Sequence, residues 1–178
     1  AMKKKPAGKQ ANVRTPKPEP LAQPSMQTVL PAQLHTWFAL VCALLGLVLY
    51  LNTLGHDYVL DDEMVTFKNT IVTKGISAIP EILTTAYREG FWDRQESLYR
   101  PLSLVMFAVE WQLAPNNPLL GHLMNILLYA LTGWLVYRLM HTWMKSQHQL
   151  IPLAAALLFM AHPLHTEVVA NIKSRDEI

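Results

Sequence analysis

The chain has 178 residues, of which 51% are hydrophobic and 16% are charged, and its net charge at pH 7 is +2. Its apolar residues are gathered in blocks separated by polar segments, which is typical of a membrane protein rather than a soluble domain. The single cysteine, Cys42, lies inside the first apolar block, which excludes a disulfide framework and a cluster of metal-binding thiols.

Residues 1–33 form a basic segment with six Lys or Arg against one acid, and they also contain six prolines. Because they hold few large apolar side chains, they cannot offset the entropy of ordering, and we expect a disordered tail. The positive-inside rule places this tail in the cytoplasm. Basic residues before a membrane span commonly set its orientation, which already accounts for this charge. We therefore expect no nucleic-acid partner.

The first apolar block, Trp37–Leu54, contains no charged residue. As a helix it would cover about 27 Å of a hydrocarbon core about 30 Å thick, which predicts a transmembrane helix over residues 34–54. A cleaved signal peptide is the alternative. The long basic region and the lack of a small-x-small cleavage pattern after this block favour a retained anchor.

Residues 55–118 hold nine acids against five Lys or Arg, which predicts an exported loop. Its acidic motif is Asp61-Asp62-Glu63, and residues 79–86 have the spacing of a short surface helix. A second amphipathic helix is expected to start at Pro101 and to be apolar almost all round except for Glu110. At about 20 Å it is too short to span the bilayer, so it would lie in the interface or pack under the loop.

Two further apolar runs follow. We predict a second transmembrane helix over residues 119–137 and a cytoplasmic loop over residues 138–149, which carries Arg138 and Lys145 and no acid. A third span is expected in residues 150–178, but its apolar run reaches only about 18 Å before Pro163. Either that span extends past both ends of the run, or it breaks at Pro163 and its polar residues face a wet cavity.

The sequence therefore predicts an all-α membrane protein with three transmembrane helices and an exported loop. Ala1 precedes the first Met, and the sequence stops inside a helix-like segment, so we expect a fragment of a longer protein. In the predicted orientation three polar clusters meet on the exported side, where ionisable residues near hydrocarbon usually have a function or a partner. The clusters are Asp61-Asp62-Glu63, His122 with Asn125, and His162 with His165 and Glu167.

The two adjacent aspartates, Asp61 and Asp62, point to different sides of a loop or helix start. One could face a hydroxyl substrate as a general base while its neighbour binds a cation or an amide. The alternative is a solvated loop, or an N-cap for a helix that starts near Glu63.

Histidines and arginines offer further candidate sites. His162 and His165 could share one helical face, but their spacing to Glu167 is not the zinc-binding His-Glu-x-x-His pattern. Alternatively, Pro163 starts a helix whose first turn carries Glu167, which suits the helix dipole. The guanidinium of Arg100 suits the phosphate of a lipid-linked donor, and its alternative role is an ordinary contact with lipid headgroups.

Four motifs in this order carry a family resemblance: Asp61-Asp62, Tyr99-Arg100-Pro101-Leu102, His122-Leu123-Met124-Asn125, and the run from His162 to Val169. From about residue 56 to residue 178 the chain resembles the start of the transmembrane and tetratricopeptide-repeat O-mannosyltransferases and their bacterial relatives. These are similar to the wider class of multi-span GT-C glycosyltransferases.

The resemblance implies an enzyme that takes a sugar, typically mannose, from a polyprenyl or dolichyl phosphate on the exported side. The sugar would pass to a Ser or Thr hydroxyl of an acceptor protein, in the endoplasmic reticulum membrane or a bacterial inner membrane. Asp61 or Asp62 would activate the acceptor, and a divalent metal is used by some of the wider class and not by others. The donor phosphate would be bound by Arg100 with His162 or His165, and the supporting residues would be Glu63, His122, Asn125, Glu167 and Arg175.

Two other function classes compete with this reading. A membrane scaffold would bind a partner through the outer loop and would leave the acids merely solvated. A transporter would use Asp61, Asp62 and His162 as a proton or ion relay.

Overall fold

The computed structural model describes residues 31–92, 97–144, 148 and 150–178, so nearly all of the predicted disordered tail lies outside the described residues. Every regular element in the described part is a helix, which confirms the predicted all-α class. The elements are α1 (Ala32–Tyr50), η1 (Leu51–Gly55), α2 (Asp62–Val65), η2 (Val72–Ala78), α3 (Ile79–Ile82), α4 (Pro101–Leu113), α5 (Pro118–Trp143), α6 (Leu150–Met160), α7 (His165–Ala170) and η3 (Ile172–Glu177).

Two of the described helices are long and apolar enough to cross a membrane, namely Ala32–Gly55 and Pro118–Trp143. The predicted third span is not shown, because α6 has 11 residues and covers only about 16 Å. The helix stops at Met160, and a separate short helix, α7, begins after Pro163. Proline lacks an N–H and disfavours a helical residue before it, which accounts for the break.

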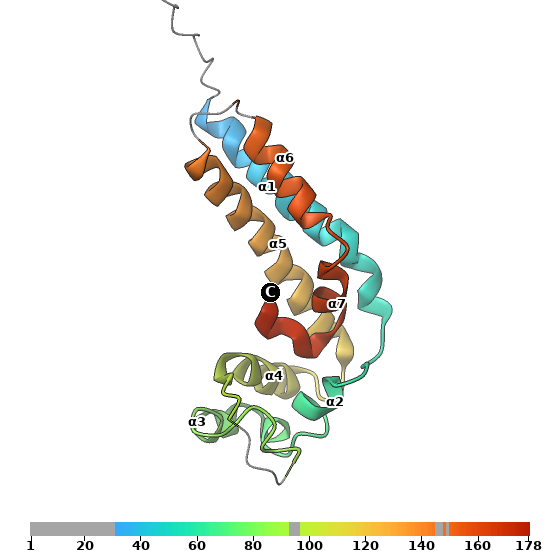
Figure 1. Cartoon of the computed structure of the whole chain (residues 1–178). Helices are drawn as coiled ribbons and strands as arrows, with labels where there is room; N and C mark the ends of the chain where they lie inside the picture. The colour runs from blue at the N-terminus through green and yellow to red at the C-terminus, as the bar shows by residue number, and fades with distance from the viewer. Residues whose placement is uncertain (1–30, 93–96, 145–147, 149) are drawn as a thin grey trace, which may run out of the picture.

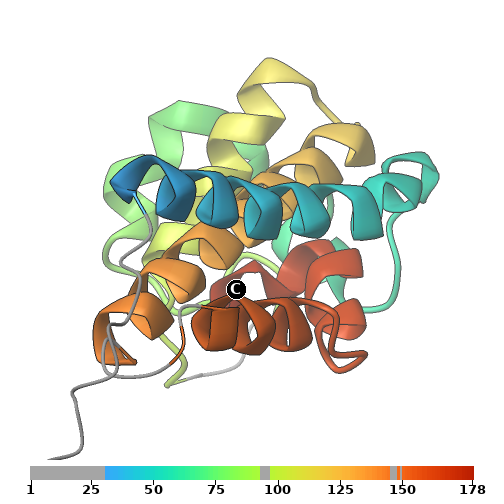
Figure 2. The same cartoon turned by 90° about the horizontal axis from the view of Figure 1, so that it is seen from above.

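The long helices α1, α5 and α6 lie side by side, as Figures 1 and 2 show from two directions. Glycines permit their close approach: a Cβ atom at Gly133 would lie 2.9 Å from the carbonyl oxygen of Cys42 and 2.7 Å from Cε of Met160. Small residues at helix crossings are the usual means of packing in membranes. The opposite face of α1 exposes an apolar stripe of Leu40, Leu44 and Val48, which suits contact with lipid.

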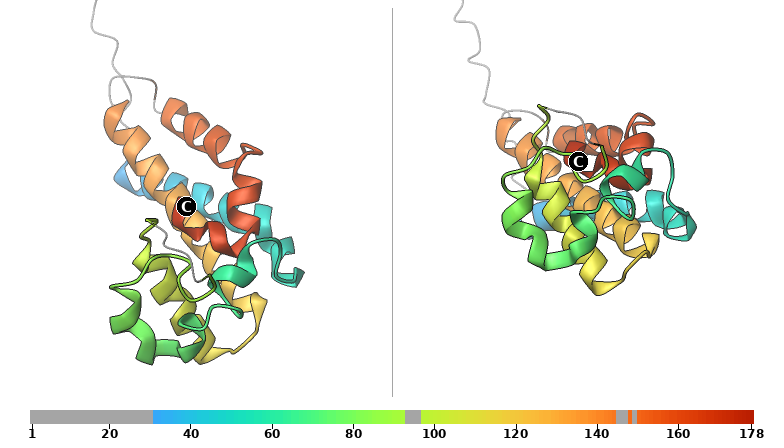
Figure 3. Two further views of the ribbon diagram at one scale, coloured as in Figure 1. Left: turned by 60° about the horizontal axis from the view of Figure 1, so that its bottom comes forward. Right: turned by 90° about the horizontal axis from the view of Figure 1, so that it is seen from below.

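The segment between the two spanning helices folds into a second group of elements, α2, η2, α3 and α4, which lies below the long helices in Figure 1. It has its own core, in which Val65, Val72, Ile82, Tyr87 and Phe107 are buried together. The C-terminal segment α7–η3 lies between this group and the long helices, as Figures 1 and 3 show. It therefore contacts both parts of the molecule.

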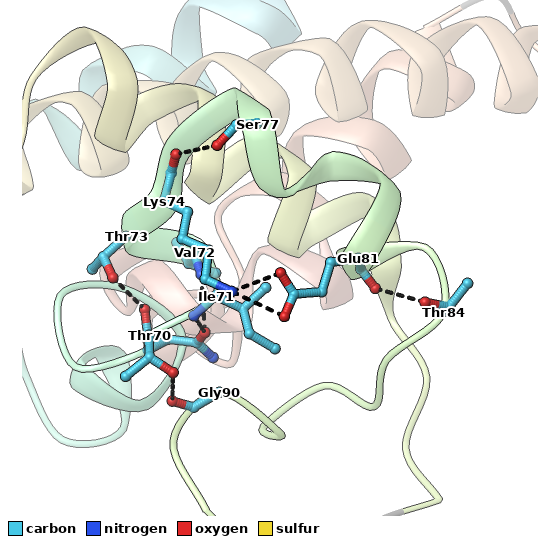
Figure 4. A network of polar contacts seen from close by, with 10 residues as sticks. Thr70, Ile71, Val72, Thr73, Lys74, Ser77, Glu81, Thr84 and Gly90 are labelled. Atoms are coloured by element: carbon cyan, nitrogen blue, oxygen red, sulfur yellow. Dashed lines mark hydrogen bonds and ion pairs between the residues drawn. The ribbon is translucent and has the colours of Figure 1, made fainter.

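Short polar contacts fix the turns of this second group. Thr70 donates two hydrogen bonds to the carbonyl oxygen of Gly90 (Figure 4). Its backbone nitrogen lies 2.9 Å from that oxygen and its hydroxyl oxygen lies 3.0 Å from it. Lys74 and Glu81 form an exposed ion pair at 2.8 Å. Asn69 accepts hydrogen bonds from two successive backbone amides, both at 3.0 Å. The group is thus a folded unit and not a run of extended loop.

Candidate functional site

The two aspartates of the acidic motif occupy different environments. Asp62, the first residue of α2, is fully buried. Its carboxylate accepts a hydrogen bond from the backbone amide of Val59 at 3.0 Å and another from that of Lys173 at 2.8 Å. Burial raises the pKa of the Asp62 carboxyl, and these two amides oppose that shift. Asp62 thus ties the start of α2 to η3.

Asp61 faces outward, and 44% of its side chain is exposed. One carboxylate oxygen lies 3.2 Å from the ammonium nitrogen of Lys173, whose side chain is 22% exposed. The same lysine therefore binds Asp62 through its backbone and Asp61 through its side chain. Glu63 forms a separate, partly exposed ion pair with Lys68 at 2.5 Å. Of the three acids, Asp61 has the most exposed side chain, and its ion pair with Lys173 fixes its position.

Arg175 is the centre of a buried polar cluster, with 5% of the residue exposed. Its guanidinium donates to the side-chain oxygen of Asn125 at 2.8 Å, to the carbonyl oxygen of Gly121 at 3.1 Å and to both carboxylate oxygens of Glu110. It also stacks on the ring of Phe107, with 4.5 Å to the centroid. Removing either partner of such a buried ion pair leaves an uncompensated charge. Arg175 therefore joins α4, α5 and η3.

The N-terminal end of α5 continues this cluster. The side-chain nitrogen of Asn125 donates to the carbonyl oxygens of Asn171 at 2.9 Å and Val169 at 3.3 Å. His122 is fully buried, and neither of its ring nitrogens has a hydrogen-bond partner of good geometry among the described residues. Its ring lies edge-on to His56, with 6.1 Å between centroids. Both predicted supporting residues of α5 therefore face the protein interior.

Arg100 belongs to a second candidate site, because it lines a groove of about 350 Å³ between α4 and α5. Its guanidinium pairs with the carboxylate of Asp176 and lies 5.7 Å from the ring centroid of Tyr87. The groove wall is mostly apolar, and its lining includes Leu102, Met106, Leu128, Leu131 and Leu135. Leu131 and Leu135 are half exposed, so the groove opens on the face of α5 that a membrane would cover.

The predicted histidines lie elsewhere. The ring of His165 packs 4.6 Å from that of Phe159 and 5.5 Å from that of Tyr129, on the side of α5 that faces α6. His162 is exposed, and its Nδ1 accepts from the amide of Leu164 at 3.3 Å. Neither histidine is among the residues that line the groove at Arg100.

Two other expectations concern Glu167 and a metal. Glu167 is exposed on α7 and is not gathered into the Arg175 cluster. In residues 31–92, 97–144, 148 and 150–178, no three His, Cys, Asp or Glu side chains lie close enough together to hold a metal ion.

Four residues of this region were not singled out as site residues by sequence reasoning: Tyr87, Glu110, Lys173 and Asp176. Glu110 carried a signal, as the single acid of an otherwise apolar helix. The other three are ordinary residues in mixed segments, and only the folded chain brings them to the site. The hydroxyl of Tyr87, for example, donates to the carbonyl oxygen of Lys173 at 3.2 Å.

The chain is similar in sequence to curated proteins. It is 34% identical over 143 residues to protein O-mannosyl-transferase Tmtc1 of Drosophila melanogaster, which covers 77% of this chain and 16% of that protein. It is 32% identical to Tmtc2 of Drosophila melanogaster, with 86% of this chain and 17% of that protein covered. TMTC2 of Mus musculus is 32% identical over 78% of this chain and 16% of its own length.

No family model matches the chain, and no solved structure matches it. The chain spans about one sixth of the length of the curated relatives named above. Those relatives share the name of one enzyme family, and each aligns with more than three quarters of this chain. The chain therefore belongs to the family of transmembrane and tetratricopeptide-repeat O-mannosyltransferases.

Proposed function

We propose that this chain supplies the reaction centre of a membrane O-mannosyltransferase that uses a polyprenyl- or dolichyl-phosphate mannose donor. The observation that carries the proposal is the mostly apolar groove that has Arg100 in its lining. An isoprenoid chain needs an apolar, membrane-facing surface, and its phosphate needs a cation at the end of that surface. Arginine suits this role because its guanidinium binds phosphate oxygens through paired hydrogen bonds.

In this proposal the donor enters the groove from the side. The leucines Leu128, Leu131 and Leu135 recur along one face of α5, a helix long enough to span the bilayer. The lipid tail would lie along them, and the phosphate would reach Arg100 at the start of α4. Arg175 also borders the groove, but its side chain is only 2% exposed, whereas that of Arg100 is 36% exposed, so Arg100 is the phosphate ligand we assign.

Asp61 is the general base in this proposal. Its carboxylate would take the proton of a Ser or Thr hydroxyl while the hydroxyl oxygen attacks the anomeric carbon of mannose. The bond between that carbon and the phosphate oxygen breaks, and the bonding electrons leave with the lipid phosphate. Arg100 would stabilise the negative charge that develops there. Asp62 and Lys173 hold Asp61 in place and do not touch the substrate.

The orientation in this proposal rests on charge. Six Lys or Arg against one acid in residues 1–33 favour a cytoplasmic location for that segment, and the acid-rich residues 55–118 would then be exported. The relatives' names support a membrane protein that acts on an acceptor protein, and the exported side would be the lumen of the endoplasmic reticulum or the bacterial periplasm.

The test is mannose transfer in membranes by the full-length protein supplied with radiolabelled polyprenyl-phosphate mannose. Asp61→Asn should abolish labelling of protein at matched expression. Arg100→Gln should raise the KM for the donor at least tenfold, the size expected for a lost charge-assisted contact of about 1.5–3 kcal/mol. The controls, Glu81→Gln and Lys74→Gln, break an exposed ion pair on another part of the surface. They should leave both the labelling of protein and the KM for the donor unchanged.

Wild-type labelling in Asp61→Asn would contradict the role of Asp61. If no donor gives label with the wild type and ion uptake changes with Asp61 or Asp62, the transporter reading replaces this one. A partner captured equally by wild type and Asp61→Asn, with no label on any protein, would favour the scaffold.

A further inference from the structure

The phosphate ligand assigned above, Arg100, is already paired in this structure. Its guanidinium contacts the carboxylate of Asp176, a residue of η3 whose side chain is only 9% exposed. The other carboxylate oxygen of Asp176 lies 3.4 Å from the hydroxyl of Tyr87, over whose ring the Arg100 guanidinium is placed. Asp176 is therefore held in the wall of the groove by two contacts.

Each described cationic side chain in the lining of the groove is already paired with a carboxylate. Two arginines and one aspartate border it, namely Arg100, Arg175 and Asp176. Glu110 neutralises Arg175, and Asp176 neutralises Arg100. An anionic ligand at Arg100 would either displace Asp176 or lie beside its carboxylate. Displacement costs the same for every ligand, because it breaks the same ion pair. A ligand that lies beside the carboxylate is repelled in proportion to its own negative charge, because like charges in a partly buried site are weakly screened.

The two lipid phosphates of the proposed reaction differ in charge. The mannosyl donor is a phosphodiester with one negative charge. The lipid phosphate that remains after transfer is a monoester, which carries about −1.5 to −2 at neutral pH, as phosphate monoesters on proteins do. A nearby carboxylate therefore repels the spent carrier about twice as strongly as the donor.

We propose that Asp176 is a specificity-determining counter-ion that removes the preference which an unpaired Arg100 would have for the more highly charged spent lipid phosphate over the singly charged donor. It thereby promotes product release. This inference rests on the proposed function of the groove. Asp176 touches neither the acceptor nor the reacting carbon, and it acts only through the charge that it sets at Arg100.

The test measures binding of three probes to the full-length protein: polyprenyl-phosphate mannose, polyprenyl phosphate and neutral polyprenol. Asp176→Asn should tighten both phosphates, and because the repulsion scales with charge, a threefold gain for the donor implies about a five- to ninefold gain for polyprenyl phosphate. Inhibition of transfer by polyprenyl phosphate should strengthen by the same factor. Polyprenol binding should not change.

Matched variants make the result specific. Glu177→Gln removes the same charge from the exposed neighbouring residue and should leave the donor-to-product ratio at the wild-type value. Asp176→Glu keeps the charge and should also keep the ratio. Asp176→Ser is a second neutral variant, to be used if Asp176→Asn does not fold, and it should show the same selective gain.

Two failures can be told apart. If Arg100→Gln binds polyprenyl phosphate as well as the wild type does, or polyprenol binds as tightly as polyprenyl phosphate, the groove is not the donor site and the proposed function fails. In the second case, Arg100→Gln loses its preference for phosphate, so the donor site stands. If the neutral variants of Asp176 then gain affinity equally for donor and product, or lose affinity for both, the inference about Asp176 is overturned.

Discussion

The two aspartates of the acidic motif should fail in different ways when each is changed to asparagine. Asp62 is fully buried and accepts from two backbone amides, at 3.0 Å and 2.8 Å. Asparagine offers one oxygen in place of two, so one amide would meet an NH2 group and lose its acceptor. A lost hydrogen bond to a charged group costs about 1.5–3 kcal/mol, and the neutral side chain recovers part of the desolvation cost. We expect Asp62→Asn to lower the free energy of unfolding by about 2 kcal/mol.

Asp61→Asn should behave otherwise, because its ion pair with Lys173 is partly exposed and such pairs contribute less than about 1 kcal/mol. The assay heats the full-length protein in detergent and measures the folded fraction by size-exclusion chromatography. Mannose transfer is then measured at a temperature where both variants are folded. Asp62→Asn should lose thermal stability, whereas Asp61→Asn should keep stability and lose turnover. Equal stability of the two variants, or full turnover by Asp61→Asn, would refute the division of roles.

Three further predictions concern stability. Gly133→Ala should destabilise the packing of α1 on α5 by about 1–3 kcal/mol, because its Cβ would lie 2.9 Å from a backbone carbonyl oxygen. Gly55→Ala is the control: its Cβ would have nothing within 4 Å, so the variant should be near neutral in the same melting assay. In urea unfolding, Arg175→Gln should lower the free energy of unfolding by about 3–5 kcal/mol, because it leaves the Glu110 carboxylate buried without its partner. Arg175→Lys keeps the charge but not the paired hydrogen bonds, so it should recover only part of this loss. Burial raises the pKa of Tyr87 to about 12 from the ordinary value of 10, so the unfolded chain loses this proton first and stability should fall as pH rises from 10 towards 12. Tyr87→Phe should remove the contribution of Tyr87 to the slope of unfolding free energy against pH, which is at most about 1.4 kcal/mol per pH unit. An unchanged slope in this variant would contradict the assignment of that contribution to Tyr87.

Composition alone predicted the helical class and the two spanning helices, because a long uncharged run satisfies its backbone hydrogen bonds in a membrane only as a helix. The inner end of the second helix was predicted at residue 137, but α5 continues to Trp143. Arg138 was taken as a boundary. In the structure its guanidinium lies 5.5 Å from the ring centroid of Trp134, and a long basic side chain can follow an apolar helix while its charge reaches the interface.

The candidate site was predicted only where the signal was local. The adjacent aspartates are visible in the sequence, but Lys173 is separated from Asp62 by 111 residues, and nothing in the local pattern connects them. The two histidines were grouped with Arg100 because all were expected at one membrane face. Membrane depth does not determine which side of a helix a residue occupies, and His165 lies beside Tyr129 instead.

The buried cluster around Arg175 also has a consequence for synthesis. Glu110 leaves the ribosome 65 residues before the arginine that neutralises it. At the usual 5–20 residues per second, that interval is about 3–13 s. During this time the carboxylate has no partner in η3, and the amide that Lys173 gives to Asp62 is also still to come. The earlier helices can therefore enter the membrane but cannot settle into their final packing until η3 has been made.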